Sequence, residues 1–368
     1  MSNTFLDVHV LQSVPPSNLN RDDTGAPKTA FYGGVRRARV SSQAWKRATR
    51  TAFGQYVDKD ELGIRTKRII ELLAREITAV DPTLEDSAEE LAEDVVKAIG
   101  VKVEKSKTEA AYLLFFSHLQ IAKAARQAAE DHNNGVKFAK KTYKEILAAD
   151  NSLDIALFGR MIADLTDLGV DAAAQVAHAI SVHAVESEAD YFTAVDDAKA
   201  ADPDRDAGAG MIGTVEFNSS TLYRYATVNL AQLQENLGTA EAVEQALGAF
   251  AKAFALSLPT GKINTFGNET VPAAIVYSVR TDRPISLVEA FEEPIGAGHG
   301  YVAPAVERLV AYAQDVDETY GAARGYWTAG LGDKAAELDS LARRSTLDQA
   351  ASDAVAFAVS ALRESQGA

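Results

Sequence analysis

The chain has 368 residues, of which 47% are hydrophobic and 24% charged, and its formal net charge is −15 at pH 7. This length and apolar content are enough to bury a large core, and they favour two or three structural units. There is no cysteine, which excludes disulfides, thiolate metal sites and cysteine nucleophiles. The N-terminus lacks a secretory signal pattern, and no apolar run approaches the ~18 residues of a membrane span. We therefore expect a cytoplasmic protein without a membrane partner.

Positive charge is concentrated near the N-terminus of this acidic chain. Residues 1–50 contain eight Lys/Arg and three Asp/Glu, whereas the rest of the chain contains 29 basic and 49 acidic residues. The segment 28–50, KTAFYGGVRRARVSSQAWKRATR, has seven basic residues and no acid. Such a cluster on a chain that otherwise repels polyanions is compatible with one localised site for an anionic ligand.

The first predicted element is a strand at residues 4–12, TFLDVHVLQ, because this segment is apolar and β-branched. We expect the strand to end at the pair Pro15-Pro16. Residues 17–40 contain Asn, Asp, Gly and Pro throughout, including the pair Gly33-Gly34, and they predict a loop.

A helix is predicted over about residues 43–57, with Ser41 or Ser42 as its N-cap. A helical wheel places a polar and basic stripe at Gln43, Lys46, Arg47 and Arg50. The opposite side carries Ala44, Trp45, Ala48 and Ala52, which we expect to pack against a sheet. The first turn adds free backbone N–H groups and the positive end of the helix dipole, where phosphates bind.

The chain changes character after this helix. Residues 60–150 are rich in Ala, Glu, Lys and Leu at helical spacing, and they predict a mainly helical insertion that continues to about residue 180. Residues 181–195, SVHAVESEADYFTAV, predict a strand. The Asp-, Gly- and Ala-rich segment 196–213 has no clear period and predicts a loop or a hairpin arm.

The C-terminal part contains further strands at 220–230 and 272–279, separated by a helix around 239–258. Residues 286–364 predict helices joined by Gly-rich connections. Without the insertion and the loop, the order of elements is β-α-β-β-α-β, which is the ferredoxin-like order that RNA-recognition domains also use. The sequence therefore predicts an α+β protein, although this topology alone does not define a function.

The basic helix has two interpretations at this point. Its cations can bind an anionic ligand, or they can form a solvated face that pairs with acids of the helical insertion. Four more cations lie just upstream without a neutralising acid: Lys28, Arg36, Arg37 and Arg39. The residues alone leave both interpretations open.

Four ordered blocks within residues 17–238 resemble one protein family. They are LNRDDTGAPKTAFYGGVRRARVSSQAWKRA, DIALFGRM, ADYFTAVDD and GTVEFNSSTLYRYATVNLAQLQENLG. These blocks are similar to the repeated backbone subunit (CasC) of the type I-E CRISPR Cascade surveillance complex. The similarity weakens in the helical insertion and in the C-terminal third of the chain.

The resemblance implies a right-hand shape, with an RRM-like palm, helical fingers and a thumb loop. It implies these boundaries: 1–58, 181–192 and 215–368 for the palm, 59–180 for the fingers and 193–214 for the thumb. Copies of the family subunit stack along the CRISPR RNA (crRNA) guide. The implied partners are therefore crRNA, target DNA through the guide heteroduplex, further copies of the chain and other Cascade subunits. The implied subunit is not an enzyme.

The resemblance also implies a set of RNA-binding residues. They are Asn20, Arg21 and Lys28 in the loop, Ser41, Gln43, Lys46 and Arg50 on the basic helix, Met161 in FGRM, and Tyr191, Phe192 and Thr193 at the root of the thumb. The loop and helix residues are expected to contact the guide backbone, and the apolar and aromatic residues to lie against bases. Tyr191 stands where the family pattern has a Trp.

Two other function classes remain as alternatives. Asp22 and Asp23 permit a metal-dependent RNA endonuclease, although adjacent carboxylates in a loop more often orient the backbone or pair with arginine. A purely structural oligomer, whose basic ridge contacts the acidic face of a neighbouring copy, is the third possibility. Cleavage of RNA in the presence of Mg²⁺ would identify the endonuclease. Nucleic acid that co-purifies with the chain would argue against the purely structural oligomer.

Two further patterns do not indicate a cofactor or a metal. GAGMIG at 208–213 has the letters of a dinucleotide-binding loop, but no predicted strand precedes it and no predicted helix follows it. His178 and His183 are five residues apart and have no clustered ligands around them. We expect neither a cofactor nor a metal site.

Overall fold

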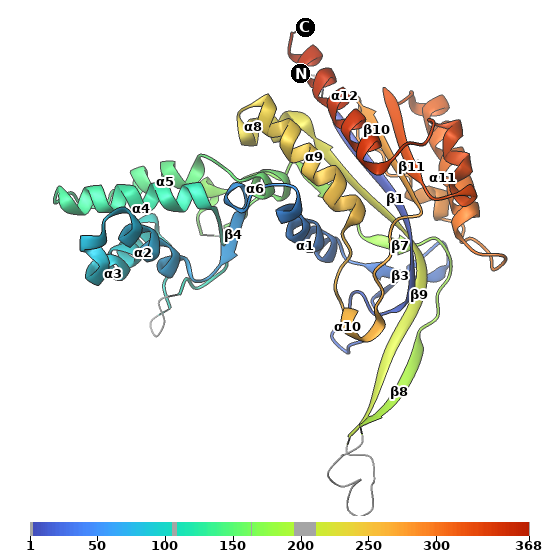
Figure 1. Ribbon diagram of the computed structural model, residues 1–368, viewed down its shortest axis with the longest axis horizontal. Helices are drawn as coiled ribbons and strands as arrows, with labels where there is room; N and C mark the ends of the chain where they lie inside the picture. Colours follow the sequence, from blue (N-terminus) through green and yellow to red (C-terminus); the bar gives the residue numbers. More distant parts are fainter. Residues whose placement is uncertain (1–2, 105–108, 163, 195–210, 368) are drawn as a thin grey trace, which may run out of the picture.

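The computed structural model describes residues 3–104, 109–162, 164–194 and 211–367. These residues form a large antiparallel sheet with helices on both faces, a separate helical lobe and a projecting two-stranded arm (Figure 1). The predicted α+β class is confirmed. Most of the predicted thumb, residues 195–210, lies outside the described residues.

Within the described ranges, the main sheet has nine strands in the order β11-β10-β1-β9-β7-β3-β2, with β6 and β8 also paired to β9. Its strands are β1 (Phe5–Ser17), β2 (Thr29–Tyr32), β3 (Val35–Val40), β6 (Ala174–Val176), β7 (Ala179–Ser181), β8 (Glu188–Ala194), β9 (Met211–Asn229), β10 (Ala274–Arg280) and β11 (Gly325–Gly330). Their pairings are antiparallel.

The centre of this sheet has ferredoxin-like connectivity. The chain passes from β1 through α1 (Ser42–Ala52) and the helical lobe to β7, turns back into β9, and continues through α9 (Ala240–Leu256) to β10. The spatial order β10-β1-β9-β7 therefore places the fourth strand beside the first and the third beside the second. This is the arrangement that the predicted β-α-β-β-α-β order requires.

The sheet is buried on both faces, and β1 shows why. Its side chains alternate, so Leu6 and Val8 enter one core while Leu11 enters another. The first core lies beneath α1, α9 and α12 (Leu347–Gly367) and also contains Trp45. The second core lies beneath α11 (Val302–Tyr320). A continuous apolar run such as that of β1 is what a strand covered on both faces requires.

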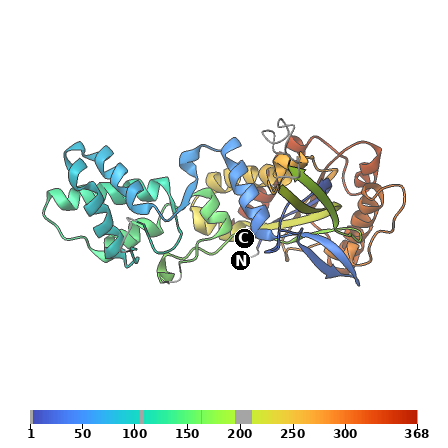
Figure 2. The same ribbon diagram turned by 90° about the horizontal axis from the view of Figure 1, so that it is seen from below.

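The helical lobe is a separate packing unit. It consists of α2 (Ile69–Val80), α3 (Ala88–Ile99), α4 (His118–Asn133) and α5 (Lys140–Ala148), with the two-stranded sheet of β4 (Gly63–Thr66) and β5 (Leu114–Ser117). These helices bury an apolar cluster of their own, which includes Ile70, Leu73 and Phe116. Figures 1 and 2 show the lobe at one end of the molecule and the sheet at the other, with α1 between them.

Shorter helical segments connect the larger elements. They are α6 (Leu153–Phe158), α8 (Leu230–Leu237), α10 (Ile263–Phe266), and the 3₁₀ segments Phe53–Gln55, Lys59–Glu61, Pro82–Ser87, Thr166–Leu168, Val288–Phe291 and Asp333–Ser340. No helix in the described part of the chain is both long and apolar enough to span a lipid bilayer.

The two-stranded arm consists of β8 and the first part of β9, paired from Glu188 with Phe217 to Ala194 with Met211. It leaves the main sheet and projects away from the other layers (Figure 1). The side chains of residues 188–193 are all exposed. A lone two-stranded ribbon is only marginally stable in water. At the root of the arm, the ring of Phe217 packs against that of Phe266 in the segment Ile263–Phe266, with ring centres 5.8 Å apart.

Three predictions of local structure were wrong. Residues 17–40 contain the hairpin of β2 and β3 instead of a continuous loop, because Gly33 and Gly34 adopt positive φ angles of 58° and 77° and form a tight hairpin turn. The predicted helical insertion over 59–180 ends earlier, since β6 and β7 pair with β9 in the main sheet. The C-terminal part contains β11 as well as helices.

The first strand, β1, also ends at a later residue than predicted. β1 continues through the Pro15-Pro16 pair to Ser17, and its register against β9 shifts between Val14 and Ser17. A proline cannot donate to a ladder, so a strand that contains two needs such an irregularity. The predicted helices at α1 and α9 and the strand at β10 are confirmed to within a few residues.

Candidate nucleic-acid interface

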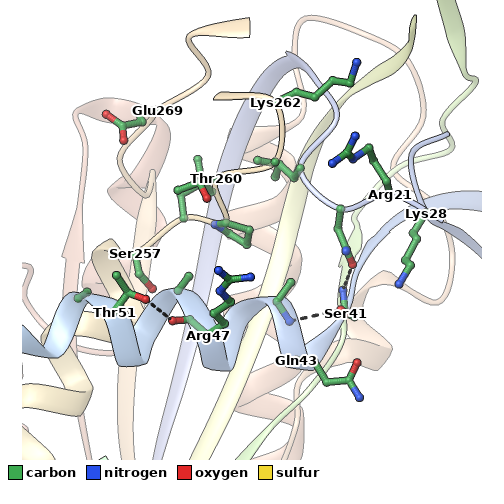
Figure 3. A pocket seen from close by; sticks show the side chains of 18 of the residues that line it. Arg21, Lys28, Ser41, Gln43, Arg47, Thr51, Ser257, Thr260, Lys262 and Glu269 are labelled. Carbon is green, nitrogen blue, oxygen red and sulfur yellow. Dashed lines mark hydrogen bonds between the residues drawn. The ribbon is translucent and has the colours of Figure 1, made fainter. Parts of the chain in front are cut away.

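A polar groove of about 1170 Å³ lies along α1. One wall is the loop that precedes β2, the floor is α1, and the other wall is the segment after α9 (Figure 3). We call it the cationic groove; its lining includes Asn20, Arg21, Asp22, Asp23, Lys28, Ser41, Gln43, Arg47, Thr51, Ser257, Thr260, Gly261, Lys262 and Glu269.

The N-terminus of α1 is ordered by side chains that belong to the groove. Ser41 has an extended backbone, and its Oγ accepts from the backbone N–H of Ala44 at 3.3 Å. Its own N–H donates to Oδ1 of Asn20 at 2.9 Å. The backbone N–H of Lys28 donates to the carbonyl of Asn20 at 2.8 Å. Asn20 therefore joins the loop to the start of the helix, where the first turn carries no acidic residue.

The loop of the first wall is shaped by Asp22. Its Oδ1 accepts hydrogen bonds from the hydroxyl of Thr24 at 2.7 Å, the N–H of Thr24 at 2.9 Å and the N–H of Ala26 at 3.0 Å. These bonds, the Thr24 hydroxyl first, hold the pKa of Asp22 below its ordinary value. The carboxylate orients the turn that carries Arg21.

The orientation of α1 differs from the predicted wheel. Trp45 and Thr49 are fully buried, whereas Ala44 and Ala52 are only partly buried and line the groove. The large indole determines which side faces the core, since it buries far more area than an alanine methyl group. Gln43 and Arg47 consequently face the groove, and the predicted stripe is divided between two faces.

Lys46 and Arg50 are partly buried on another face of α1 and do not line the groove. The guanidinium of Arg50 lies 5.1 Å from the ring centre of Phe115 in the helical lobe. Burial lowers the pKa of Lys46 and that of Arg50, and in Arg50 the Asp154 carboxylate opposes the shift. In the part of the chain that the structure describes, no ion pair involves Lys28, Lys46 or Arg50.

The second wall of the groove is residues 257–262, which we call the 257–262 loop. It rests on the first wall: a Cβ added at Gly261 would lie 2.2 Å from the carbonyl oxygen of Leu19. The next residue, Lys262, has a positive φ of 48°, an uncommon conformation for a residue with a side chain. Figure 3 shows Lys262, Arg21, Lys28 and Arg47 around the same groove.

Arg47 and Lys262 are groove cations that the sequence did not assign to RNA binding. Arg47 was part of the basic stripe and carried that signal. Lys262 is isolated in the sequence, and it reaches the groove only because Gly261 packs on a loop more than 240 residues earlier. No local pattern identifies such a residue.

Met161 lies away from the groove and is 90% exposed. The preceding residue, Arg160, is buried, and its guanidinium donates four hydrogen bonds: to the carbonyls of Leu168, Phe115 and Leu147 and to Oε1 of Gln120. Gly159 supplies a positive φ of 78°. The turn is therefore rigidly anchored through Arg160, and this presents the apolar Met161 side chain to solvent.

Tyr191, Phe192 and Thr193 lie on β8 in the projecting arm. Tyr191 and Phe192 are 62% and 39% exposed. The Phe192 ring covers its cross-strand partner Gly213, where an added Cβ would lie 2.5 Å from the ring. The predicted residues thus form three groups: five in the groove, two on the outer face of α1, and four on the Met161 turn and the arm.

The two histidines noted in the sequence have separate roles. His178 hydrogen-bonds with Arg39 at 3.1 Å, and His183 stacks on Tyr301 with ring centres 3.7 Å apart. Within the described ranges, no group of three or more His, Asp or Glu side chains is arranged to hold a metal ion. The residues 208–210 of GAGMIG are outside those ranges, and 211–213 belong to β9.

The fold and the groove together define an α+β protein with a ferredoxin-like core and a groove whose cations form no ion pair within the described ranges. The chain belongs to the CT1975-like Cas family, whose sequence pattern matches residues 6–353. No curated protein matches it.

The solved structures that match include two that are similar over almost the whole chain. One chain of a structure described as "CRISPR RNA-guided surveillance complex, pre-nicking" is 35% identical, with a TM-score of 0.83, and the match covers 96% of this chain and 100% of that one. A chain of a "CRISPR RNA-guided surveillance complex" is 30% identical, with a TM-score of 0.76, and the match covers 96% of this chain and 99% of that one.

Proposed function

We propose that this chain is a non-catalytic, crRNA-binding backbone subunit of a type I-E Cascade complex. It polymerises along the guide RNA with other copies of itself and with other Cascade subunits. The guide then pairs with target DNA in antiviral defence. The observation that supports the proposal has two parts that occur together. The groove contains unpaired cations, and the chain is similar over almost its full length to a chain of an RNA-guided surveillance complex.

The chemistry of the groove suits a sequence-independent polyphosphate ligand. Arg21, Lys28 and Arg47 supply charge, and the first turn of α1 supplies backbone N–H groups. Contacts to phosphates hold a strand without reading its sequence, so the base edges remain available for pairing. This is what a guide-binding subunit requires, because guides of any sequence must fit the same groove.

The remaining residues suit contacts with unpaired bases. Met161, Tyr191 and Phe192 expose apolar or aromatic surface outside the groove. Every base has a π-face, so such contacts tolerate any sequence and are worth ~1–3 kcal/mol per stacked base. Lys46 and Arg50 on the outer face of α1 extend the phosphate path toward the helical lobe.

The absence of catalysis is part of the proposal. The alternative is a metal-dependent endonuclease that uses Asp22 and Asp23. Asp22 already accepts three hydrogen bonds that shape the loop, so its carboxylate is used to orient the backbone. We expect complementary RNA to remain intact when it is incubated with the protein and Mg²⁺.

The test is charge reversal in the groove with a matched control. We expect R21E/K28E to weaken binding of single-stranded RNA by more than tenfold. The slope of log K against log salt should also fall by ~0.7 for each phosphate that the variant no longer neutralises. The control K334E/R343E makes the same change in net charge on exposed residues away from the groove. Equal RNA affinity in both variants, or Mg²⁺-dependent cleavage that disappears in D22N/D23N, would contradict the proposal.

A further inference from the structure

Arg224 of β9 is a buried cation close to the cationic groove. Only 1% of its surface is exposed. Its guanidinium lies 3.8 Å from the ring centre of Trp45 on α1 and 4.9 Å from that of Phe254 on α9. The charge is therefore placed between the two helices that border the groove.

Arg224 has hydrogen-bond acceptors but no carboxylate partner in the described part of the chain. It donates to the carbonyls of Phe254 and Ala255 and to Oε1 of Gln12. Arg280, another buried arginine, instead pairs with Asp282 and Asp317. Burial lowers the pKa of Arg224 to about 9. A buried charge without a counterion is costly and persists where the surroundings over-determine it.

Two of the three acceptors of Arg224 lie just before the second wall of the groove. Phe254 and Ala255 lie in the last turn of α9, where unpaired carbonyls and the negative end of the helix dipole favour a cation. The chain then leaves the helix at Leu256 and forms the 257–262 loop. On the other side, Trp45 belongs to α1, the floor of the groove, and its ring is held by the same guanidinium.

A second contact controls the rim of the groove. Gly261 lies against the carbonyl of Leu19, so any side chain there would push the 257–262 loop from the first wall. At the base of the groove, the hydroxyls of Thr49 and Ser257 lie 3.3 Å apart. The separation of the walls is thus set at the rim by Gly261 and beneath the floor by Arg224.

We infer that Arg224 is a positioning residue for binding of the polyphosphate ligand. It holds α1 and the 257–262 loop at the separation at which Arg47 and Lys262 contact one nucleic-acid strand. Arg224 does not line the groove and touches no ligand itself. The inference rests on the proposed function, since it concerns the same groove.

The test uses R224K, which keeps a basic side chain and removes the planar fork that binds several acceptors at once. Affinity of the full chain for a labelled single-stranded RNA is measured over a range of salt concentrations. We expect about tenfold weaker binding. We also expect the slope of log K against log salt to be smaller by ~0.7 for each phosphate that the groove cations no longer contact. The matched control is R280K, a buried arginine outside the groove.

Two further measurements separate positioning from general damage to the fold. In a W327F background Trp45 is the remaining tryptophan, and its emission should change in R224K and not in R280K. G261A leaves the buried charge intact and displaces the rim, so it should also lower the salt slope. This second variant tests the groove separation even if R224K does not fold.

The outcomes are distinct. A wild-type chain that does not bind RNA overturns the proposed function, and the role of Arg224 with it. A wild-type chain that binds, with unchanged salt slopes in R224K and G261A, overturns only the positioning role. In that case any weaker binding by R224K reflects a smaller fraction of folded protein. Reduced slopes in both variants with a normal slope in R280K support it.

Discussion

The helical lobe and the cationic groove differ in whether their exposed cations form ion pairs. In the lobe, lysines lie beside acids: Lys67 and Glu104 are 3.1 Å apart, Lys97 and Glu93 2.6 Å, and Lys123 and Asp150 2.6 Å. In the groove, Arg21, Lys28, Arg47 and Lys262 have no ion pair within the described ranges. The number of cations is thus a weaker sign of a binding site than whether those cations are ion-paired, since the groove also contains Asp22, Asp23 and Glu269.

This difference has energetic consequences. An exposed ion pair contributes ~0–1 kcal/mol, so the pairs of the lobe contribute little to stability. Unpaired cations that share a groove repel one another in the free protein. A polyanion removes that repulsion and releases its own counterions, which makes binding strong and sensitive to salt.

The largest expected effect comes from reversing the charges on the outer face of α1. We expect K46E/R50E to weaken RNA binding by more than tenfold, because two unpaired cations become acids beside the groove. Filter binding at several salt concentrations measures this, with K334E/R343E as the control. Unchanged affinity would confine the phosphate path to the groove and contradict the contacts implied for Lys46 and Arg50.

A smaller effect is expected from K262Q, which removes one groove cation contributed by the second wall. RNA affinity should fall by roughly threefold to tenfold, and the salt slope by ~0.7. The same titration with K262R should restore most of the affinity, since the charge remains. An affinity of K262R as low as that of K262Q would indicate that the shape of the lysine side chain matters more than its charge.

The smallest effect is expected in the lobe. K123Q breaks the pair with Asp150 on an exposed surface, and the free energy of unfolding should change by less than ~1 kcal/mol. RNA affinity and its salt slope should stay at the wild-type values. A decrease in affinity comparable to that of K262Q would show that the paired lysines of the lobe also reach the ligand, and the contrast between the two regions would fail.

The sequence predicted the parts of the site that depend on local chemistry. Ser41 begins α1 because a hydroxyl at that position caps a helix, and no longer-range contact is needed. Which face of α1 is buried was predicted less well, because the helical wheel gave each of three alanines the same weight as one tryptophan. The indole buries far more apolar area than an alanine methyl group. Lys262 was missed because its place depends on the contact between Gly261 and Leu19, which no local pattern encodes.

The same distinction applies to the fold. Long periodic segments such as α9 and the strand at β10 were predicted, since their pattern repeats over several turns or residues. β6 and β7 have three residues each, and their alanines resemble those of the preceding helices. They become strands because β9 offers a partner. The hairpin of β2 and β3 did have a signal in the Gly33-Gly34 pair, which the loop assignment did not use.

The projecting arm has a consequence for the chain before assembly. Tyr191, Phe192 and Ile212 leave apolar surface in water on a ribbon with no layer behind it. Such surface adheres to other chains when nothing else covers it. In a cell that synthesises this polypeptide faster than its binding partners, unassembled copies would accumulate and associate through this apolar surface. A matched supply of those partners therefore protects the solubility of the polypeptide.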